Sequence, residues 1–159
     1  MFGKLILVAA VVGAGYGLLE FRQNPADIPE PVYAEIRLSL PIPTREISAV
    51  AYGKMTSRTD CERRSERALE KSMSDCAECR FSLSSCRTDL EPRYLRLFDD
   101  EPIHATYIAF HRGSRFERDV RLVYWGLTPQ ESQEVCALVQ KAAKRNYSGR
   151  VECVLGTLR

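Results

Sequence analysis

The fold is decided by residues 116–131, FERDVRLVYWGLTPQE, in which a strand pattern runs directly into the start of a helix. Two sets of residues alternate along the first part: Phe116, Arg118, Val120, Leu122 and Tyr124 against Glu117, Asp119 and Arg121. A period of two is typical of a strand with one buried face. The helix start at residues 128–131 combines an N-cap threonine, a proline at the first helical position and a glutamate that closes a capping box. We therefore expect a strand ending at Gly126 and a helix that runs to about Arg145.

Strand patterns lie on both sides of this segment. Residues 103–110 are apolar on both faces, which is typical of a central strand, and residues 112–115 supply a hairpin turn. Residues 151–155 predict a last strand. Further upstream, residues 46–55 predict a strand and are followed by a helix that starts at a Thr59–Glu62 capping box. One face of this helix carries Cys61, Ser65, Ala68, Leu69, Met73 and Cys76.

From residue 46 the order is strand, helix, strand, strand, helix, strand, which predicts an α+β sandwich of the ferredoxin-like kind. An extra alternating strand, residues 32–40, precedes it and ends at a turn over residues 41–43. The stretch from residue 75 to residue 102 is an insertion, with a short strand near 81–85 and a helical turn near 93–98. Residues 33–159 are expected to form this one domain.

Composition excludes several classes of protein. The chain has 159 residues, of which 45% are hydrophobic, and 23 Lys and Arg stand against 21 Asp and Glu. This balance gives no basic surface for nucleic acid, so no nucleic-acid partner is expected. The ordinary apolar fraction argues against wholesale disorder.

The N-terminal residues predict a membrane segment. Residues 5–19 are uncharged and mostly apolar, and Lys4 precedes them, so residues 1–23 are interpreted as a transmembrane anchor that contacts the membrane through residues 5–19. A cleaved signal peptide is the alternative interpretation, and a buried helix is the third. Gly13 and Gly17 have the spacing that permits close contact with another helix.

The positive residue near the start predicts the orientation. Lys4 is expected to stay in the cytoplasm, which makes the chain a single-pass protein of the inner membrane with its domain in the periplasm. Residues 24–32 contain three prolines and are interpreted as a semi-rigid stalk between the anchor and the domain.

Six cysteines outside the cytoplasm predict three disulfides. Cys136 lies on the last helix and Cys153 at a matching distance along the returning strand, so these two are expected to pair. For the other four we favour Cys61 with Cys86 and Cys76 with Cys79, because a continuous helix would hold Cys61 about 22 Å from Cys76. The alternative is Cys61 with Cys79 and Cys76 with Cys86.

The Cys76-Ala-Glu-Cys79 motif also matches a redox-active pair. Its position after a helix, next to Asp75 and Glu78, disfavours a reactive thiolate, so structural bridging is the preferred interpretation. A zinc site that uses these cysteines and Cys86 is less favoured.

The sequence identifies no catalytic residue, metal ligand or cofactor motif. His104 and His111 have opposite parity on one strand and are not expected to chelate together. The acidic residues 99–101 precede a proline and are interpreted as a solvated turn, with a cation-binding cluster as the less favoured alternative.

The arginines at 112, 115, 118 and 121 crowd one hairpin, where a mixed-charge solvated face is the simpler interpretation and a partner-binding surface the functional one. Arg112, Arg115, Arg118 and Arg121 are the candidate partner-binding residues.

These features predict a non-enzymatic accessory protein of the bacterial envelope that docks onto another envelope component. The alternatives are a membrane-tethered thiol-disulfide oxidoreductase that uses Cys76 and Cys79, and a module that binds an anionic glycan through the arginine hairpin.

Overall fold

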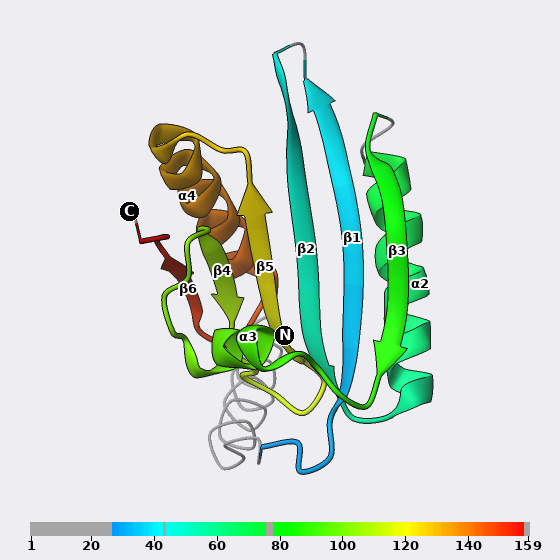
Figure 1. Cartoon of the computed structure of the whole chain (residues 1–159). Helices are drawn as coiled ribbons and strands as arrows, with labels where there is room; N and C mark the ends of the chain where they lie inside the picture. The colour runs from blue at the N-terminus through cyan, green and yellow to red at the C-terminus, as the bar shows by residue number, and fades with distance from the viewer. Residues whose placement is uncertain (1–26, 43, 76–77, 158–159) are drawn as a thin grey trace, which may run out of the picture.

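Six antiparallel strands and three α-helices lie in residues 27–42, 44–75 and 78–157, which are the residues that this computed structural model describes (Figure 1). The predicted α+β class is confirmed. The elements in chain order are β1 (Val32–Ile42), β2 (Arg45–Met55), α2 (Arg58–Asp75), β3 (Arg80–Arg87), α3 (Pro92–Leu95), the 3₁₀ helix η1 (Arg96–Asp99), β4 (Tyr107–Phe110), β5 (Asp119–Trp125), α4 (Pro129–Asn146) and β6 (Val151–Val154).

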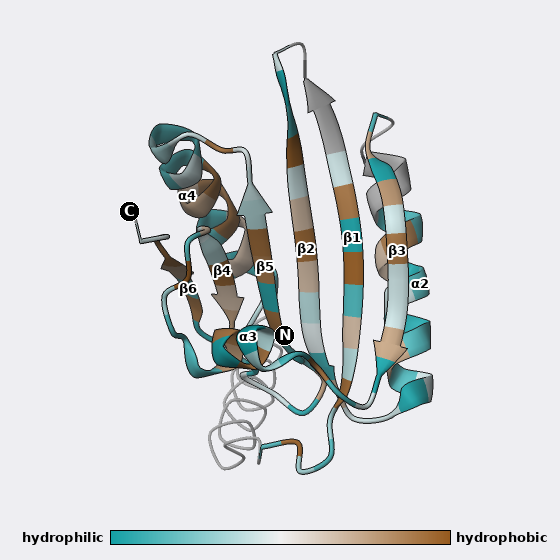
Figure 2. Ribbon diagram, viewed as in Figure 1, coloured by the Kyte–Doolittle hydropathy of each residue, from teal (hydrophilic) through white to brown (hydrophobic). Residues whose placement is uncertain are grey.

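The sheet is built around the β1–β2 hairpin, whose eleven paired positions run from Val32 opposite Met55 to Ile42 opposite Arg45. The strand order is β3-β1-β2-β5-β4-β6. Strand β3 returns along β1, with a register shift between Arg37 and Leu38, so the predicted insertion contributes an edge strand. The alternation of hydropathy along β1 and β2 is visible in Figure 2 and matches a sheet whose two faces meet different surroundings.

The predicted ferredoxin-like strand order is wrong at one place. That order requires the last strand to pair with β2, but β6 pairs with β4 at the opposite edge. The physical reason is that β1 forms a long hairpin with β2 and occupies the edge that β6 would need. A short connection after α4 then brings β6 alongside β4, which is the edge that remains open.

One face of the sheet is covered by α2 and α4, which lie on the same side in Figure 1. The apolar side of the hairpin, with Val32, Ala34 and Met55, packs around Cys61 of α2. Figure 2 shows that the rest of α2 is mostly hydrophilic. A mostly polar helix with one narrow contact stripe gains its stability from the sheet that it covers.

The second face is covered at one end by α3 and η1. Its core contains Tyr52, Leu97, Tyr107 and Val123, all almost fully buried. The insertion therefore supplies a layer of its own, and the sheet is buried on both faces at this end. Of the predicted strand over residues 103–110, only Tyr107–Phe110 pairs in the sheet.

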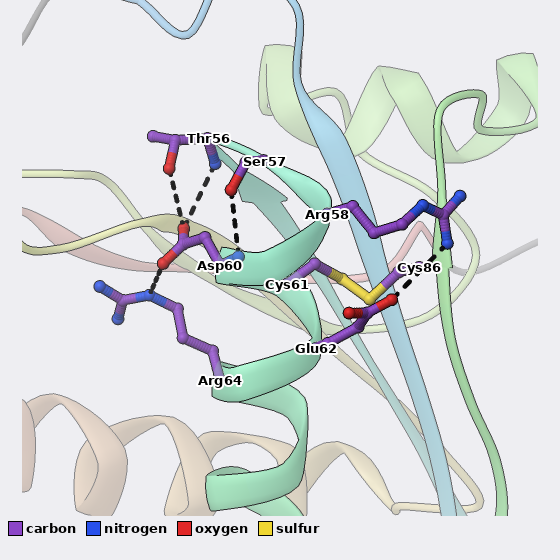
Figure 3. The surroundings of a disulfide bond; sticks show 8 residues. All are labelled: Thr56, Ser57, Arg58, Asp60, Cys61, Glu62, Arg64 and Cys86. Carbon is purple, nitrogen blue, oxygen red and sulfur yellow. Dashed lines mark hydrogen bonds and ion pairs between the residues drawn. A yellow bond between two sulfur atoms is a disulfide. The ribbon is translucent and has the colours of Figure 1, made fainter.

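The two long helices begin differently. The predicted capping box of α4 is present, since the Thr128 side chain accepts from the Glu131 backbone N–H and the Glu131 side chain accepts from Thr128. For α2 the predicted box at Thr59 and Glu62 is wrong. The helix starts two residues earlier, and the Ser57 hydroxyl accepts from the Asp60 backbone N–H (Figure 3). Asp60, at the third helical position, also accepts from the Thr56 backbone N–H.

The predicted membrane anchor, residues 1–23, and the first three residues of the predicted stalk, residues 24–26, lie outside the described residues. In the rest of the stalk, Ile28 is buried and Val32 begins β1, so the described end of this segment packs onto the domain. Among the residues that are described, no helix has the length and apolar character needed to cross a membrane.

Disulfides join each long helix to an edge strand. Cys61 of α2 is bonded to Cys86 of β3, and Cys136 of α4 is bonded to Cys153 of β6, which are the pairs that the sequence favoured. The third predicted pair includes Cys76, which lies outside the described residues, while Cys79 is disulfide-bonded. Each of these two bonds joins a helix to the strand that follows it in the chain.

Replacing both Cys136 and Cys153 with alanine is expected to reduce the free energy of unfolding by about 3 kcal/mol, because the bond closes a loop with a sequence separation of 17. Urea denaturation monitored by circular dichroism measures the difference. The matched control is the unaltered chain after reduction and alkylation, which should lose at least as much. A double variant as stable as the parent would show that helix packing alone holds β6.

Candidate functional site

A groove lies on the second face of the sheet, beyond the end that α3 covers. It has a volume of about 480 Å³ and is lined by residues of β1, β2, β3, α3 and β5. These are Arg37, Leu38, Ser39, Glu46, Ser48, Ala49, Val50, Tyr52, Ser82, Tyr94 and Trp125, and we call this surface the sheet groove. The groove exists because α3 is only four residues long and leaves the rest of the hairpin uncovered.

Two stacked tyrosines line one part of the sheet groove. The rings of Tyr52 and Tyr94 lie with their centroids 4.7 Å apart and their planes 28° apart. Burial raises the pKa of Tyr52, so its hydroxyl remains protonated at neutral pH. That hydroxyl is fully buried and meets no group with hydrogen-bond geometry among the described residues. Tyr52 therefore contributes a buried aromatic wall to the groove, and its hydroxyl is not exposed to a bound molecule.

Charged and hydroxyl groups line the sides. The Arg37 guanidinium donates to the buried Glu35 carboxylate, with a distance of 2.6 Å from Nε to Oε1. The hydrogen bond to Glu35 raises the pKa of Arg37, so this side of the groove carries a guanidinium that is held in an ion pair. Glu46 and three serines complete the polar part. The groove thus combines an aromatic pair with polar groups that can direct a bound molecule.

Trp125 is the only tryptophan of the chain and is 38% exposed at the end of β5. Its backbone pairs with Ser48 of β2, and its side chain lines the sheet groove. It also lines a second hollow of about 380 Å³, the terminal hollow, which is formed by His104, Ala105, Thr106, Tyr124, Trp125, Gly126, Leu127, Pro129, Ser132, Gln133, Leu155 and Gly156. Trp125 therefore borders both depressions, and the exposed Leu155 is among the residues that line the second.

Trp125, Tyr52 and Tyr94 belong to no motif that predicts a binding site from the sequence. A single tryptophan at the end of a strand is a signal that could have pointed to the first, since exposed Trp is enriched at binding surfaces. Tyr52 and Tyr94 are 42 positions apart in sequence, and no local pattern relates them.

The four arginines of the predicted partner-binding surface do not share one surface. Arg121 is 1% exposed, and its guanidinium donates to the backbone carbonyls of Leu97 and Phe110 and to Asp100. Arg118 is largely buried against Asp60. Arg112 donates to the carbonyls of Ser114 and Arg115. Arg115 lies over the exposed ring of Phe116. The expectation of one solvated arginine face is wrong for Arg121, because the insertion covers the side of β5 on which it lies.

Asp60 is the centre of the network that holds Arg118. The carboxylate is buried and accepts from Arg118 Nε at 2.6 Å. It also accepts from Arg64 Nε at 2.8 Å and from the Thr56 backbone and hydroxyl, as Figure 3 shows. This network ties the start of α2 to the segment before β5. The arginine therefore fixes the fold and presents little charge to solvent.

The predicted redox motif is described only in part. Cys76 lies outside the described residues, and Cys79 is disulfide-bonded and half-buried. The thiol-disulfide oxidoreductase function stays a prediction.

The two histidines lie at different ends of β4. His104 precedes the strand, is exposed and lines the terminal hollow. His111 follows the strand and lies close to Asp100 and Glu152. Burial and the neighbouring Arg121 lower the pKa of His111 despite these two carboxylates, so its ring is neutral at pH 7. Asp100 belongs to the acidic turn that was predicted to be solvated, but its side chain is half-buried. It pairs with Arg121 and lies close to His111.

Comparison with known proteins identifies no similar family, no similar curated protein and no similar solved structure.

Proposed function

We propose that this chain is a non-enzymatic interaction module of the bacterial envelope, tethered to the inner membrane through residues 5–19 and docking another envelope protein through the surface around Trp125. The tether and the periplasmic location rest on the apolar N-terminal residues, on Lys4 and on the disulfides that join α2 to β3 and α4 to β6. The docking surface rests on the geometry of the second sheet face.

The observation that carries this proposal is the position of Trp125 between the sheet groove and the terminal hollow. Binding energy at protein interfaces is concentrated in a few residues, among which tryptophan is enriched, and these lie among well-packed neighbours. A partner that inserts side chains into both depressions would bury Trp125 from two sides.

The surroundings of Trp125 have the composition of such an interface. The centre is aromatic, with Tyr52 and Tyr94 on one side, and Leu155 lies 55% exposed on the other. The polar groups at the edge, Arg37 and Glu46, have opposite charge and can fix the orientation of a partner.

Replacing Trp125 with alanine is expected to weaken the complex by about thirtyfold, which is the effect of losing a residue that contributes roughly 2 kcal/mol. The full-length chain is crosslinked in native membranes and purified, and the partner that copurifies is quantified. Its affinity for the purified chain is then measured by titration. Because Trp125 is partly buried, a second variant, Ser48→Arg, fills the groove from the neighbouring strand and should have the same effect.

The matched control is Leu138→Ala, which removes a side chain that is 67% exposed on α4, away from the groove. It should leave the affinity unchanged. If the Trp125 and Ser48 variants retained the partner as well as the Leu138 variant does, the docking surface would lie elsewhere and the proposal would be wrong.

A further inference from the structure

Three potential metal ligands from separate elements converge at the end of the sheet opposite Trp125. Asp100 ends η1, His111 follows β4, and Glu152 lies on β6 opposite Ala109. His111 Nε2 is 3.4 Å from Asp100 Oδ2 and 3.7 Å from Glu152 Oε2, and the three ligand atoms all lie within 4.8 Å of one another. All three side chains are half-buried.

These separations are close to those of a tetrahedral metal site. Metal–ligand bonds of about 2.0–2.2 Å place neighbouring ligand atoms about 3.4 Å apart in a tetrahedron. The distances from His111 Nε2 to the two carboxylate oxygens therefore need only a few tenths of an ångström of adjustment. Three protein ligands leave a fourth position for water or another molecule.

The second oxygen of each carboxylate is held by an arginine. Arg121 Nη2 is 3.0 Å from Asp100 Oδ1, and Arg150 Nε is 3.2 Å from Glu152 Oε1. Each guanidinium thus binds one oxygen and leaves the other directed at His111. A partner that stays in place, as the buried Arg121 does, orients a ligand of a metal site and contributes to metal affinity. Arg121 is well suited to this role because it is itself fixed by the carbonyls of Leu97 and Phe110.

A cation already lies next to these ligand atoms. Arg150 Nη2 is 3.4 Å from His111 Nε2 and 3.7 Å from Asp100 Oδ2. A guanidinium has donors only, so a hydrogen bond between these two atoms requires Nε2 to accept, with the proton on Nδ1. This is the tautomer in which Nε2 can bind a metal. The Arg150 side chain is 62% exposed and can leave without breaking the core.

We propose that Asp100, His111 and Glu152 bind a divalent transition metal ion, for which Zn²⁺ is the best match, and that Arg150 occupies the place of the ion when no metal is bound. One imidazole and two carboxylates suit Zn²⁺ and Mn²⁺ better than the all-oxygen preference of Mg²⁺. The proposal revises the interpretation of residues 99–101 as a solvated turn, since Asp100 alone is directed inward. It is independent of the Trp125 docking surface.

The experiment titrates the full-length, oxidised chain with ZnCl₂ by calorimetry after treatment with a chelator and dialysis. One equivalent of Zn²⁺ is expected to bind, and Mg²⁺ at the same concentration is not. The variants His111→Gln and Glu152→Gln should each weaken Zn²⁺ binding by about a hundredfold, since even neighbours of the ligands cost tenfold to a hundredfold. Cobalt substitution gives a second readout, because the visible absorption bands of bound Co²⁺ should disappear in both variants.

The matched control is His104→Gln, which replaces the other histidine at the opposite end of β4 and should leave Zn²⁺ binding unchanged. Circular dichroism checks that every variant is folded. The proposal would be wrong if the chain bound no equivalent of Zn²⁺, or if His111→Gln bound Zn²⁺ as tightly as the parent. The site would then be an ion-pair cluster in which two guanidinium groups neutralise two carboxylates.

Replacing Arg150 with alanine tests whether this side chain and the metal ion compete for the same place. Removing the competing positive charge should tighten Zn²⁺ binding by several-fold. Weaker binding in this variant would show that Arg150 supports the ligands, and the proposed exchange would be wrong.

Discussion

Replacing Arg121 with methionine is expected to lower the free energy of unfolding by about 3 kcal/mol, because it removes a buried guanidinium and leaves the backbone carbonyls that it binds without a donor. The carbonyls of Leu97 and Phe110 would lose their donor, and Asp100 would lose its closest positive charge. A loss of this size is a large part of the roughly 5–15 kcal/mol that stabilises a typical domain. Urea denaturation of the purified chain measures it.

The matched control for this variant is Arg115→Met, a change of the same size at an exposed position six residues away. It should alter stability by less than about 0.5 kcal/mol, as is usual for a surface substitution. If Arg121→Met failed to give folded protein, Arg121→Lys would be measured, since it keeps the charge and loses the fork of donors. Equal stability of the Arg121 and Arg115 variants would show that the insertion stays on the sheet without this arginine.

Replacing Asp60 with asparagine is expected to destabilise the domain by about 3 kcal/mol or more at pH 7, since Arg118 would remain largely buried without its counter-charge. Burial by itself raises the pKa of Asp60, but the hydrogen bonds from Arg118 and Arg64 outweigh it and hold that pKa well below its usual range. A lowered pKa in the folded state contributes stability that is fully present above about pH 4, the unfolded value, and is lost as the pH falls below it.

The stability of the parent should therefore decline between about pH 4 and pH 2 more steeply than that of the Asp60→Asn variant. Urea denaturation at each pH measures both. Glu91→Gln is the control, because the Arg93–Glu91 pair has a similar separation of 2.8 Å with both side chains largely exposed, and an exposed pair contributes little. Parallel curves for the parent and the Asp60 variant would contradict the expected role of the carboxylate.

Short-range patterns predicted the elements well where side chains act on their own backbone. The α4 boundaries follow from a threonine, a proline and a glutamate within four residues, and they are confirmed. The start of α2 was placed two residues late because Thr59 and Glu62 satisfy the same local rule as Ser57 and Asp60. What favours the earlier start is the contact of Asp60 with Arg118, which is 58 positions away and invisible to a local rule.

The candidate sites were harder to predict because their members meet through the topology. The alternation along residues 116–125 places Arg121 on the polar face of the strand. The insertion covers that face and buries Arg121. The sheet groove brings together Tyr52, Tyr94 and Trp125 from three elements. Asp100, His111 and Glu152 likewise come from three separate segments.

Local patterns are enough to predict the α+β class, the start of α4 and the disulfide partners Cys136–Cys153 and Cys61–Cys86, because hydrophobic period, capping and helix length act over a few residues or along one rigid element. The strand order, the burial of Arg121 and the sites at the two ends of the sheet follow from contacts between distant segments. These features depend on which strand pairs with the free edge of β2 and on how the insertion packs on the sheet. In each case distant segments compete for the same surface, and the arrangement that buries more surface is favoured.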